Sequence, residues 1–257
     1  MNEDSQSSLV FSKIVDDLAT VTINRPQRRN AFDDQMIDSF AEILNSVSSQ
    51  NPRAVILTGT GDSCFSAGYD ITCIDTNQSL KEPLPDIRFE KTILAIERCK
   101  VPVIAAMNGD AYGGGLDLAL SCDFRIAREA IKVAMTPCRL GLVYSASGIA
   151  RFICKVGSNT TRKLFLTGRG IEATEAMNLG IIDEIVSKES LLEHSQKLAS
   201  DIALGAPKAV LGTRRTIQYV EQNQGLENSN NEELTGLRNS AFRSRELESR
   251  IRGFLKK

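Results

Sequence analysis

Three consecutive glycines in the middle of the chain, Gly113 to Gly115, constrain its fold more than any other feature. They follow an apolar run, residues 101–107, that is typical of a buried strand, and they lead into an apolar segment that suits a helix. Glycines at such a junction let the backbone approach a ligand closely, and the first turn of a helix leaves N–H groups without internal partners. The turn therefore suits an anion or a developing oxyanion, although a tight turn formed only for packing would use the same residues.

The overall composition argues against several classes of protein. The 257 residues are 42% hydrophobic and 25% charged, which is enough for a substantial core in a soluble globular protein. The 31 basic and 32 acidic residues are interspersed, so bulk charge favours neither a nucleic acid nor a membrane surface as a partner. No apolar run approaches the roughly 20 residues of a spanning helix, and the acidic start does not resemble a secretory signal. We therefore expect a cytoplasmic protein.

The cysteines and the single histidine argue against other kinds of site. Six cysteines are spread along the chain without a CxxC pair, and most have apolar neighbours, so we expect buried free thiols. His194 is the only histidine, which makes a Ser/His or Cys/His nucleophile and a histidine-rich metal site poor hypotheses. The fingerprints GxGxxG and GxxxxGK[ST] are both absent from the sequence, so the glycine turns do not match the common nucleotide sites.

Apolar periodicity predicts an α/β protein whose front part repeats a unit of two strands and a helix. Residues 9–15 and 18–24 predict a hairpin, and the helix that follows, residues 36–47, begins after a cap at Asp33 or Asp34. Later strands are expected at 54–58, 101–107, 124–127, 131–135 and 181–186, and later helices at 87–100, 157–165 and 172–179. Residues 72–85 are polar and contain prolines, which favours a mobile loop. From residue 191 onward, helices are expected at 191–202, 207–220 and 232–255, so we place a boundary near residue 190.

Two glycine-containing stretches resemble those of the enoyl-CoA hydratase/isomerase (crotonase) superfamily. Residues 65–71, Phe-Ser-Ala-Gly-Tyr-Asp-Ile, resemble the first oxyanion-hole motif of that family, and Asn108-Gly109 with Gly113 to Gly115 resembles the second. Asn24-Arg25-Pro26 with Asn30-Ala31 resembles its CoA-contacting segment, and parts of residues 166–183 resemble the segment that follows in the family. The resemblance covers nearly the whole chain, and the shared order and spacing of the motifs make it specific.

This resemblance implies a crotonase-like spiral of ββα units with a helical C-terminal region. Residues 1–190 would form the spiral core with the acyl-CoA site, and residues 191–257 would form a region that assembles homotrimers or homohexamers. A CoA thioester would be the substrate, without a further cofactor or metal. The apolar tail residues suit such an assembly: Leu226, Leu234, Leu237, Phe242, Leu247, Ile251 and Phe254.

The resemblance also assigns roles within the site. The backbone N–H groups of Tyr69 and Gly114 would hold the thioester carbonyl and stabilise an enolate, since one such donor is worth about 10²- to 10³-fold in rate. Arg28 or Arg29 would pair with CoA phosphates, unless both arginines are only solvated. The substrate-binding residues implied are Arg28, Ala67, Asp70, Ile71 and Thr72.

The catalytic side chains depart from the two-glutamate pattern of hydratases in the family. Asp117 stands at the first position, where it could act as a general base, orient a water, or only face the start of a helix. Pro137 stands at the second position and cannot transfer a proton. Thr136-Pro137, Leu140-Gly141 and Val143-Tyr144 instead resemble the methylmalonyl-CoA decarboxylase branch, in which Tyr144 would match an active-site tyrosine, although Tyr144 could equally be a core or interface aromatic.

These residues leave three functions open. The first is an acyl-CoA lyase of the hydratase/isomerase type, and the second is a malonyl-type decarboxylase, which needs less acid/base equipment because loss of CO₂ forms the enolate without a base. The third is a catalytically silent acyl-CoA-binding or interaction protein of the same fold, for which the missing second carboxylate argues. A nucleic-acid partner is not expected because no lysine-rich helix is present.

Overall fold

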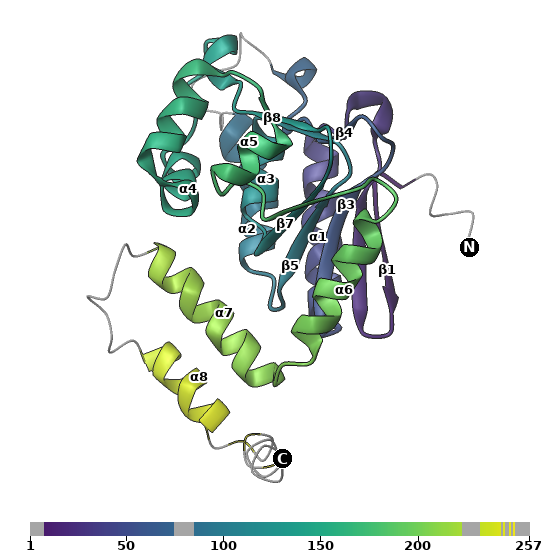
Figure 1. The fold of residues 1–257 in the computed structure, drawn as a ribbon, viewed down its shortest axis with the longest axis vertical. Coiled ribbons are helices and arrows are strands. Elements are labelled where there is room, and N and C mark those ends of the chain that lie inside the picture. Colours follow the sequence, from purple (N-terminus) through teal and green to yellow (C-terminus); the bar gives the residue numbers. More distant parts are fainter. Residues whose placement is uncertain are drawn as a thin grey trace. The chain divides into compact units, whose positions relative to one another are not determined.

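The computed structural model describes residues 8–74, 85–222 and 232–242, together with Ser244, Leu247 and Ser249. The chain divides into two compact units, Met1–Ala199 and Ser200–Lys257, and the first unit contains both β-sheets (Figure 1). The boundary predicted near residue 190 falls at the start of α6 (Leu191–Ala203), whereas the two units divide within that helix. The second unit contains α7 (Pro207–Gln222) and α8 (Glu232–Phe242), both of which lie in stretches predicted to be helical.

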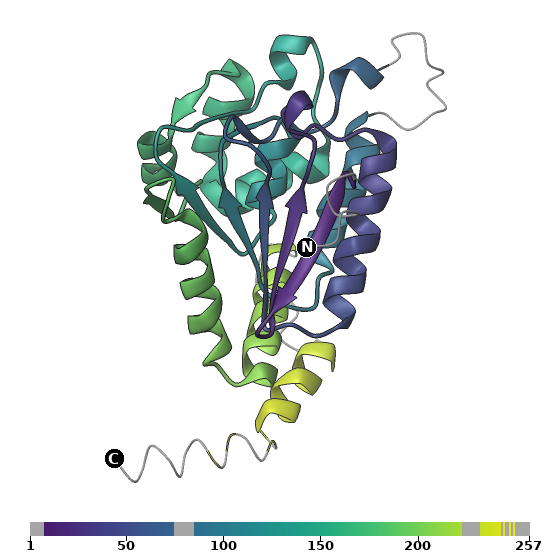
Figure 2. The same cartoon turned by 90° about the vertical axis from the view of Figure 1, so that its right-hand side faces the viewer.

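The larger sheet has six strands in the order β1-β2-β3-β5-β7-β10, which lie side by side in Figure 2. They are β1 (Val10–Val15), β2 (Leu18–Ile23), β3 (Ala54–Gly59), β5 (Val103–Met107), β7 (Phe124–Arg128) and β10 (Glu184–Val186). The hairpin of β1 and β2 is antiparallel, as predicted, and all other pairs are parallel. Every residue of β5 is buried, which is typical of a parallel strand covered on both faces.

The smaller sheet has four strands in the order β4-β6-β8-β9, all of them short. They are β4 (Cys64–Ser66), β6 (Asp110–Tyr112), β8 (Lys132–Ala134) and β9 (Ile171–Glu172). Three times, the chain places one strand in the larger sheet and the next in the smaller sheet before it forms a helix: β3-β4-α2 (Pro85–Glu97), β5-β6-α3 (Gly114–Leu120) and β7-β8-α4 (Ala146–Thr167). The predicted repeat of ββα units is therefore confirmed. Strand β6 was missed by sequence analysis because three residues are too few to show a period.

Helix α1 (Asp34–Ser49) begins where the sequence predicts. The Asp33 carboxylate accepts a hydrogen bond of 2.9 Å from the backbone N–H of Met36, which is the expected N-terminal cap. The apolar stripe of the helix is buried, and α1 packs against β1, β2 and α2. Helix α3 packs against α2, α4 and strands of both sheets, so the helix after the triple glycine lies in the core.

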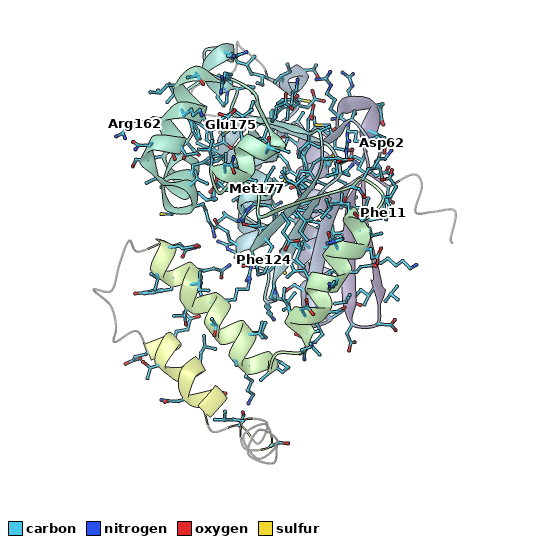
Figure 3. The ribbon with its side chains drawn as sticks, viewed as in Figure 1. Phe11, Asp62, Phe124, Arg162, Glu175 and Met177 are labelled. Carbon is cyan, nitrogen blue, oxygen red and sulfur yellow. The ribbon has the colours of Figure 1, made fainter. Side chains whose placement is uncertain are left out.

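Helix α4 was predicted too short. The apolar pattern indicates residues 157–165, but the helix begins at Ala146, where the Ser145 hydroxyl accepts a hydrogen bond of 3.2 Å from the backbone N–H of Gly148. Small residues in the first turns hide the period, and Gly157, with a φ of 77°, interrupts the helix with a kink. Beyond the kink, Leu164 is buried while Arg162 points outward at the edge of the helix (Figure 3). The following short helix, α5 (Ala173–Asn178), carries Glu175, which binds Arg169 at 3.0 Å.

The remaining sequence expectations have mixed outcomes. All six cysteines are free, but only Cys64, Cys99 and Cys122 are buried. The expectation of buried thiols is wrong for Cys73, Cys138 and Cys154, because these lie on exposed faces of short helical turns and of α4. Residues 75–84 of the predicted loop lie outside the described residues, as do the side chains of most of the apolar tail residues named above.

The described ranges lack two kinds of feature. No helix in them combines the length and the apolar character needed to cross a lipid bilayer. The same ranges contain no group of three or more His, Cys, Asp or Glu side chains arranged to hold a metal ion.

We expect Gly115→Ala to destabilise the fold strongly. A Cβ atom at this position would lie 1.9 Å from the carbonyl oxygen of Ser66 in β4, so backbone rather than a flexible side chain would have to move. Overpacking costs typically about 1–3 kcal/mol, and we expect a value at or above the upper end. The urea concentration at the midpoint of unfolding should be much lower for Gly115→Ala than for Gly170→Ala, where an added Cβ meets no atom within 4 Å. Equal midpoints for the two variants would contradict the close contact.

Candidate active site

The two glycine stretches meet in space. Gly68, which follows β4, has a φ of +79°, and a Cβ atom there would lie 2.6 Å from the backbone nitrogen of Gly114. A Cβ atom on Gly114 would lie 3.2 Å from the Cα atom of Gly68. Such an approach between two backbones requires glycine at both positions. The contact brings the residue after Gly68, which is Tyr69, to the same side of the structure as Gly114.

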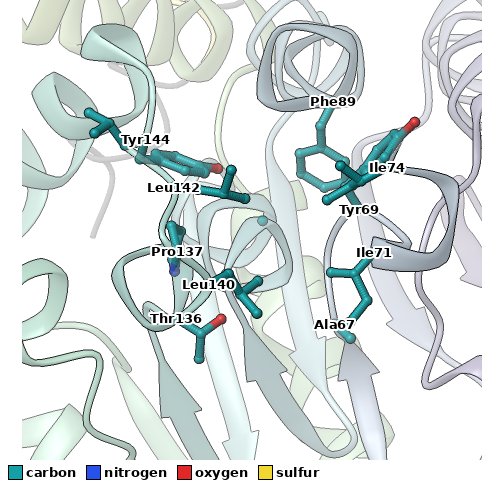
Figure 4. A pocket seen from close by; sticks show the side chains of 13 residues that line it. Ala67, Tyr69, Ile71, Ile74, Phe89, Thr136, Pro137, Leu140, Leu142 and Tyr144 are labelled. Atoms are coloured by element: carbon teal, nitrogen blue, oxygen red, sulfur yellow. The ribbon is translucent and has the colours of Figure 1, made fainter. Parts of the chain in front are cut away.

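Both residues line an apolar cavity of about 120 Å³ (Figure 4). Tyr69, Ile71, Ile74 and Phe89 lie on one side of it, and Leu142 and Tyr144 lie on the other. The full lining consists of Ala67, Tyr69, Ile71, Ile74, Phe89, Gly113, Gly114, Thr136, Pro137, Leu140, Leu142, Val143 and Tyr144. None of these thirteen residues is Asp, Glu, Lys, Arg or His. Within the described part of the chain, the backbone N–H groups of Tyr69 and Gly114 donate no hydrogen bond, so both remain available to a ligand.

The segment that resembles a CoA-contacting motif supports the first glycine stretch. The Asn30 side chain is fully buried, and its amide nitrogen donates to the carbonyl oxygens of Cys64 at 2.8 Å and Thr60 at 3.0 Å. The backbone N–H of Ala67 donates to the carbonyl of Arg29 at 3.0 Å. The asparagine of this motif therefore fixes the position of β4 and the residues after it. Arg28 and Arg29 themselves have exposed side chains next to this stretch.

Of the other residues predicted to bind substrate, Ala67 and Ile71 line the cavity, whereas Asp70 and Thr72 do not. Asp70 is buried and accepts hydrogen bonds from Arg25 at 2.8 Å and from the Thr72 hydroxyl at 2.7 Å. Burial opposes ionisation, but the hydrogen bonds from Thr72 and Arg25 outweigh it and lower the pKa of Asp70. In this structure Asp70 and Thr72 hold the loop that presents Tyr69 and Ile71.

Tyr144 lines the cavity, and Asp117 lies behind it. The Tyr144 hydroxyl donates a hydrogen bond of 2.9 Å to Oδ2 of Asp117, whose side chain is 0% exposed. Asp117 lies in the first turn of α3, as predicted, but its carboxylate binds side chains and is not part of the cavity lining. The Tyr144 ring also contacts Phe165, with ring centroids 5.7 Å apart. Tyr144 is thus both a packed aromatic and the polar side chain nearest to Asp117 in the cavity wall.

A third residue, Arg151 of α4, completes this group. Its Nη1 atom lies 2.9 Å from both carboxylate oxygens of Asp117, and its other nitrogens bind Glu90 at 2.7 Å and Glu97 at 3.0 Å. Burial raises the pKa of Asp117 to about 6, while Arg151 and the Tyr144 hydroxyl act in the opposite direction. Burial, and then the charge of Asp117, raise the pKa of Tyr144 well above its usual value, so the phenol stays protonated.

Arg151 and Glu90 were not among the residues predicted from the sequence. Arg151 lies in the first half of α4, which was not predicted to be helical. Glu90 and Glu97 are seven residues apart on α2, which places them on one face of that helix, and this spacing was an available signal. Pro137, the residue at the position of the missing second carboxylate, begins a short 3₁₀ helix (Pro137–Leu140) and lines the cavity.

The sequence is similar over most of its length to one family of known proteins. The family model described as Enoyl-CoA hydratase/isomerase matches residues 13–254. A short-chain-enoyl-CoA hydratase of Clostridium acetobutylicum is 32% identical over 201 residues, which cover 78% of this chain and 77% of that protein. A crotonyl-CoA hydratase of Syntrophomonas wolfei is 35% identical over 189 residues, 72% of each chain.

Solved structures show the same relationship. The crystal structure of an enoyl-CoA hydratase from Bacillus anthracis matches with a TM-score of 0.87 and 26% identity, over 97% of this chain and 96% of that one. An α/β fold with two sheets and surrounding helices is thus shared over almost the full length of both chains. The chain belongs to the enoyl-CoA hydratase/isomerase, or crotonase, family.

Proposed function

We propose that the protein is an enoyl-CoA hydratase that works through a thioester enolate. The observation that carries the proposal is that two free backbone N–H groups, of Tyr69 and Gly114, and the side chain of Tyr144 line one apolar cavity. Two backbone donors that converge on a thioester oxygen stabilise the negative charge that develops there, and each is worth about 10²- to 10³-fold in rate. The hydratases among the relatives support the same reaction class.

The cavity suits an apolar acyl group. Ile71, Leu140 and Leu142 line it and are also 59%, 52% and 43% exposed, which places apolar surface at its mouth. No lining side chain carries a charge that could neutralise a carboxylate on the substrate. An enoyl chain without charge would therefore enter at a lower desolvation cost than a malonyl-type chain. The exposed Arg28 and Arg29 remain our candidates for the CoA phosphates.

A single proton path replaces the pair of glutamates in this proposal. The Tyr144 hydroxyl directs its proton to Asp117, so its oxygen can accept a hydrogen bond from a water in the cavity. When the water oxygen bonds to C3 of the enoyl group, the C2=C3 electrons move into the enolate. The water proton passes to Tyr144 while Tyr144 gives its own proton to Asp117. The return of that proton along the same path to C2 completes the addition of one water.

Decarboxylation is a second candidate for one reason. The cavity lining holds no carboxylate, and loss of CO₂ from a malonyl-type thioester produces the enolate without a base. A catalytically silent acyl-CoA-binding protein would keep the same backbone donors. Assembly into homotrimers or homohexamers stays a prediction from the family resemblance.

A thioester panel separates these functions. We expect the protein to hydrate crotonyl-CoA and to leave malonyl-CoA and methylmalonyl-CoA unchanged, as followed by chromatography of the products. Release of CO₂ from methylmalonyl-CoA without hydration of crotonyl-CoA would establish the decarboxylase instead. Calorimetric binding of acetyl-CoA with turnover of none of the three would identify a silent binder, and no binding at millimolar concentration would overturn all three functions.

A further inference from the structure

We propose that Arg151 is a positioning residue that keeps Asp117 ionised and aimed at Tyr144, and that Glu90 opposes it, so that these two charges together set the lower pH limit of the reaction. This inference rests on the proposed function, because it concerns the same proton path. Neither Arg151 nor Glu90 lines the cavity, so neither is a catalytic residue. Their effect on the reaction would pass entirely through Asp117.

The geometry places one buried cation among three carboxylates. Arg151 is 8% exposed, and it binds Asp117 of α3 through Nη1 and Glu90 and Glu97 of α2 through Nη2 and Nε. The planar guanidinium serves all three carboxylates at once, which the point charge of a lysine cannot do. The three helices α2, α3 and α4 therefore meet at this side chain. Asp117 receives two hydrogen bonds from it and one from Tyr144, so its carboxylate has a fixed orientation.

The charges act on Asp117 in opposite directions. Complete burial favours the protonated, neutral carboxyl group, and Arg151 is the main opposing influence because its charge favours the carboxylate. Glu90 has the sign of Asp117 and favours protonation. A protonated Asp117 could not take the Tyr144 proton. Removal of Arg151 should therefore raise the pKa of Asp117, and removal of the Glu90 charge should lower it.

Other titratable side chains near α3 have partners of their own. Strands β4, β6 and β7 also pack against this helix. In these strands, Cys64 and Tyr112 bind Asp110, Arg125 binds Asp183, and Arg128 binds the carbonyl oxygens of Asn108 and Asp62. The groups that bear directly on Asp117 are thus Tyr144, Arg151 and Glu90, with Glu97 acting through Arg151.

The test is the pH dependence of kcat/KM for crotonyl-CoA, which reports groups of the free enzyme. In the wild type, activity should be lost as the pH falls through about 6, because Asp117 becomes protonated there. The midpoint of this loss of activity, on the pH scale, should rise by about one to three pH units in Arg151→Met, with activity partly restored at higher pH. In Glu90→Gln the midpoint should fall. Unchanged midpoints in both variants would overturn the inference, since a purely structural role predicts no opposite shifts.

Further variants separate the effect of the Arg151 charge on the pH profile from any effect of the substitution on folding. Arg151→Lys retains the positive charge but not the planar guanidinium that binds three carboxylates. Its pH midpoint should lie between those of the wild type and Arg151→Met. If Arg151→Met does not fold, Arg151→Lys and Glu90→Gln carry the test. Arg169→Met, which removes an arginine that is 59% exposed and paired with Glu175, should leave the midpoint unchanged.

A direct titration distinguishes a failure of this inference from a failure of the proposed function. The Asp117 carboxyl carbon can be followed by NMR of ¹³C-labelled protein and assigned by its loss in Asp117→Asn. If this signal shifts its midpoint in the Arg151 and Glu90 variants while no thioester is turned over, the electrostatic assignment holds and the proposed reaction is wrong. If thioesters are turned over and the midpoint does not move, the inference is wrong.

Discussion

Gly114→Pro is expected to lower kcat/KM for every thioester that the protein accepts by about 10²- to 10³-fold, the usual value of one oxyanion donor. The substitution removes the Gly114 N–H, which is free of other hydrogen bonds in the described part of the chain. Proline is tolerated in the first turn of a helix, and Gly114 is the first residue of α3, so the helix itself need not break.

Gly114→Ala provides the control for this prediction. A Cβ atom at this position would lie 2.8 Å from Cε1 of Phe89 in either variant, but alanine keeps the N–H. The steric cost of the Cβ atom is therefore present in both, and the difference in kcat/KM between them reports the missing N–H together with the Cγ and Cδ atoms of the proline ring. Equal losses in the two variants would show that the added atoms, and not the missing N–H, cause the defect. Steady-state kinetics on crotonyl-CoA with both purified proteins is sufficient.

Tyr144→Phe and Asp117→Asn are each expected to reduce hydration of crotonyl-CoA by at least about 10²-fold, because each interrupts the proposed proton path from the cavity through Tyr144 to Asp117. In a decarboxylase the two would differ. Tyr144→Phe would cost more there, since the hydroxyl orients the departing carboxylate, whereas the neutral Asn would remove a repulsive charge. Measurement of kcat/KM for both variants on crotonyl-CoA and methylmalonyl-CoA decides between the reactions.

The Asp117→Asn substitution would also disturb the hydrogen bonds that Asp117 accepts from Tyr144 and Arg151. An amide group would place an N–H next to either the Tyr144 hydroxyl or the Arg151 guanidinium, in a site that is 0% exposed. Part of any loss could therefore come from a displaced Arg151. Tyr144→Phe leaves the Asp117–Arg151 pair intact and is the cleaner measurement. Retention of full hydration activity in Tyr144→Phe would contradict the proton path.

Local patterns were sufficient to predict much of the fold. The hairpin of β1 and β2, the capped helix α1 and the glycine turn before α3 all follow from residues close together in sequence. The two glycine stretches also have distinctive local sequences, but the roles of Tyr69 and Gly114 as oxyanion donors stay predictions from the family resemblance. Segments whose apolar residues show no regular spacing, such as β6 and the first half of α4, could not be predicted in this way.

The arrangement around Asp117 depends on contacts between distant parts of the chain. Arg151 is separated from Asp117 by 34 residues and from Glu90 by 61, so no local pattern links them. The burial of Asp117 was easier to anticipate. Helix α3 is apolar on all sides apart from this residue, and a helix of that kind lies in a core. Its one carboxylate therefore had to be buried and to need a cationic partner.

The contact between Gly68 and Gly114 has a consequence for how such an enzyme can change its chemistry. In the proposed mechanism, the groups that would activate the thioester are peptide N–H groups from the first two repeats, whereas the 3₁₀ helix and Tyr144 follow β8 of the third. The proposed thioester donors and the segment that would line the acyl group thus lie in separate parts of the chain, although Asp117 lies on α3 together with Gly114. A library of variants substituted only at residues 137–144 would vary the reaction and the acyl preference. The backbone N–H groups of Tyr69 and Gly114 would be the same in every variant.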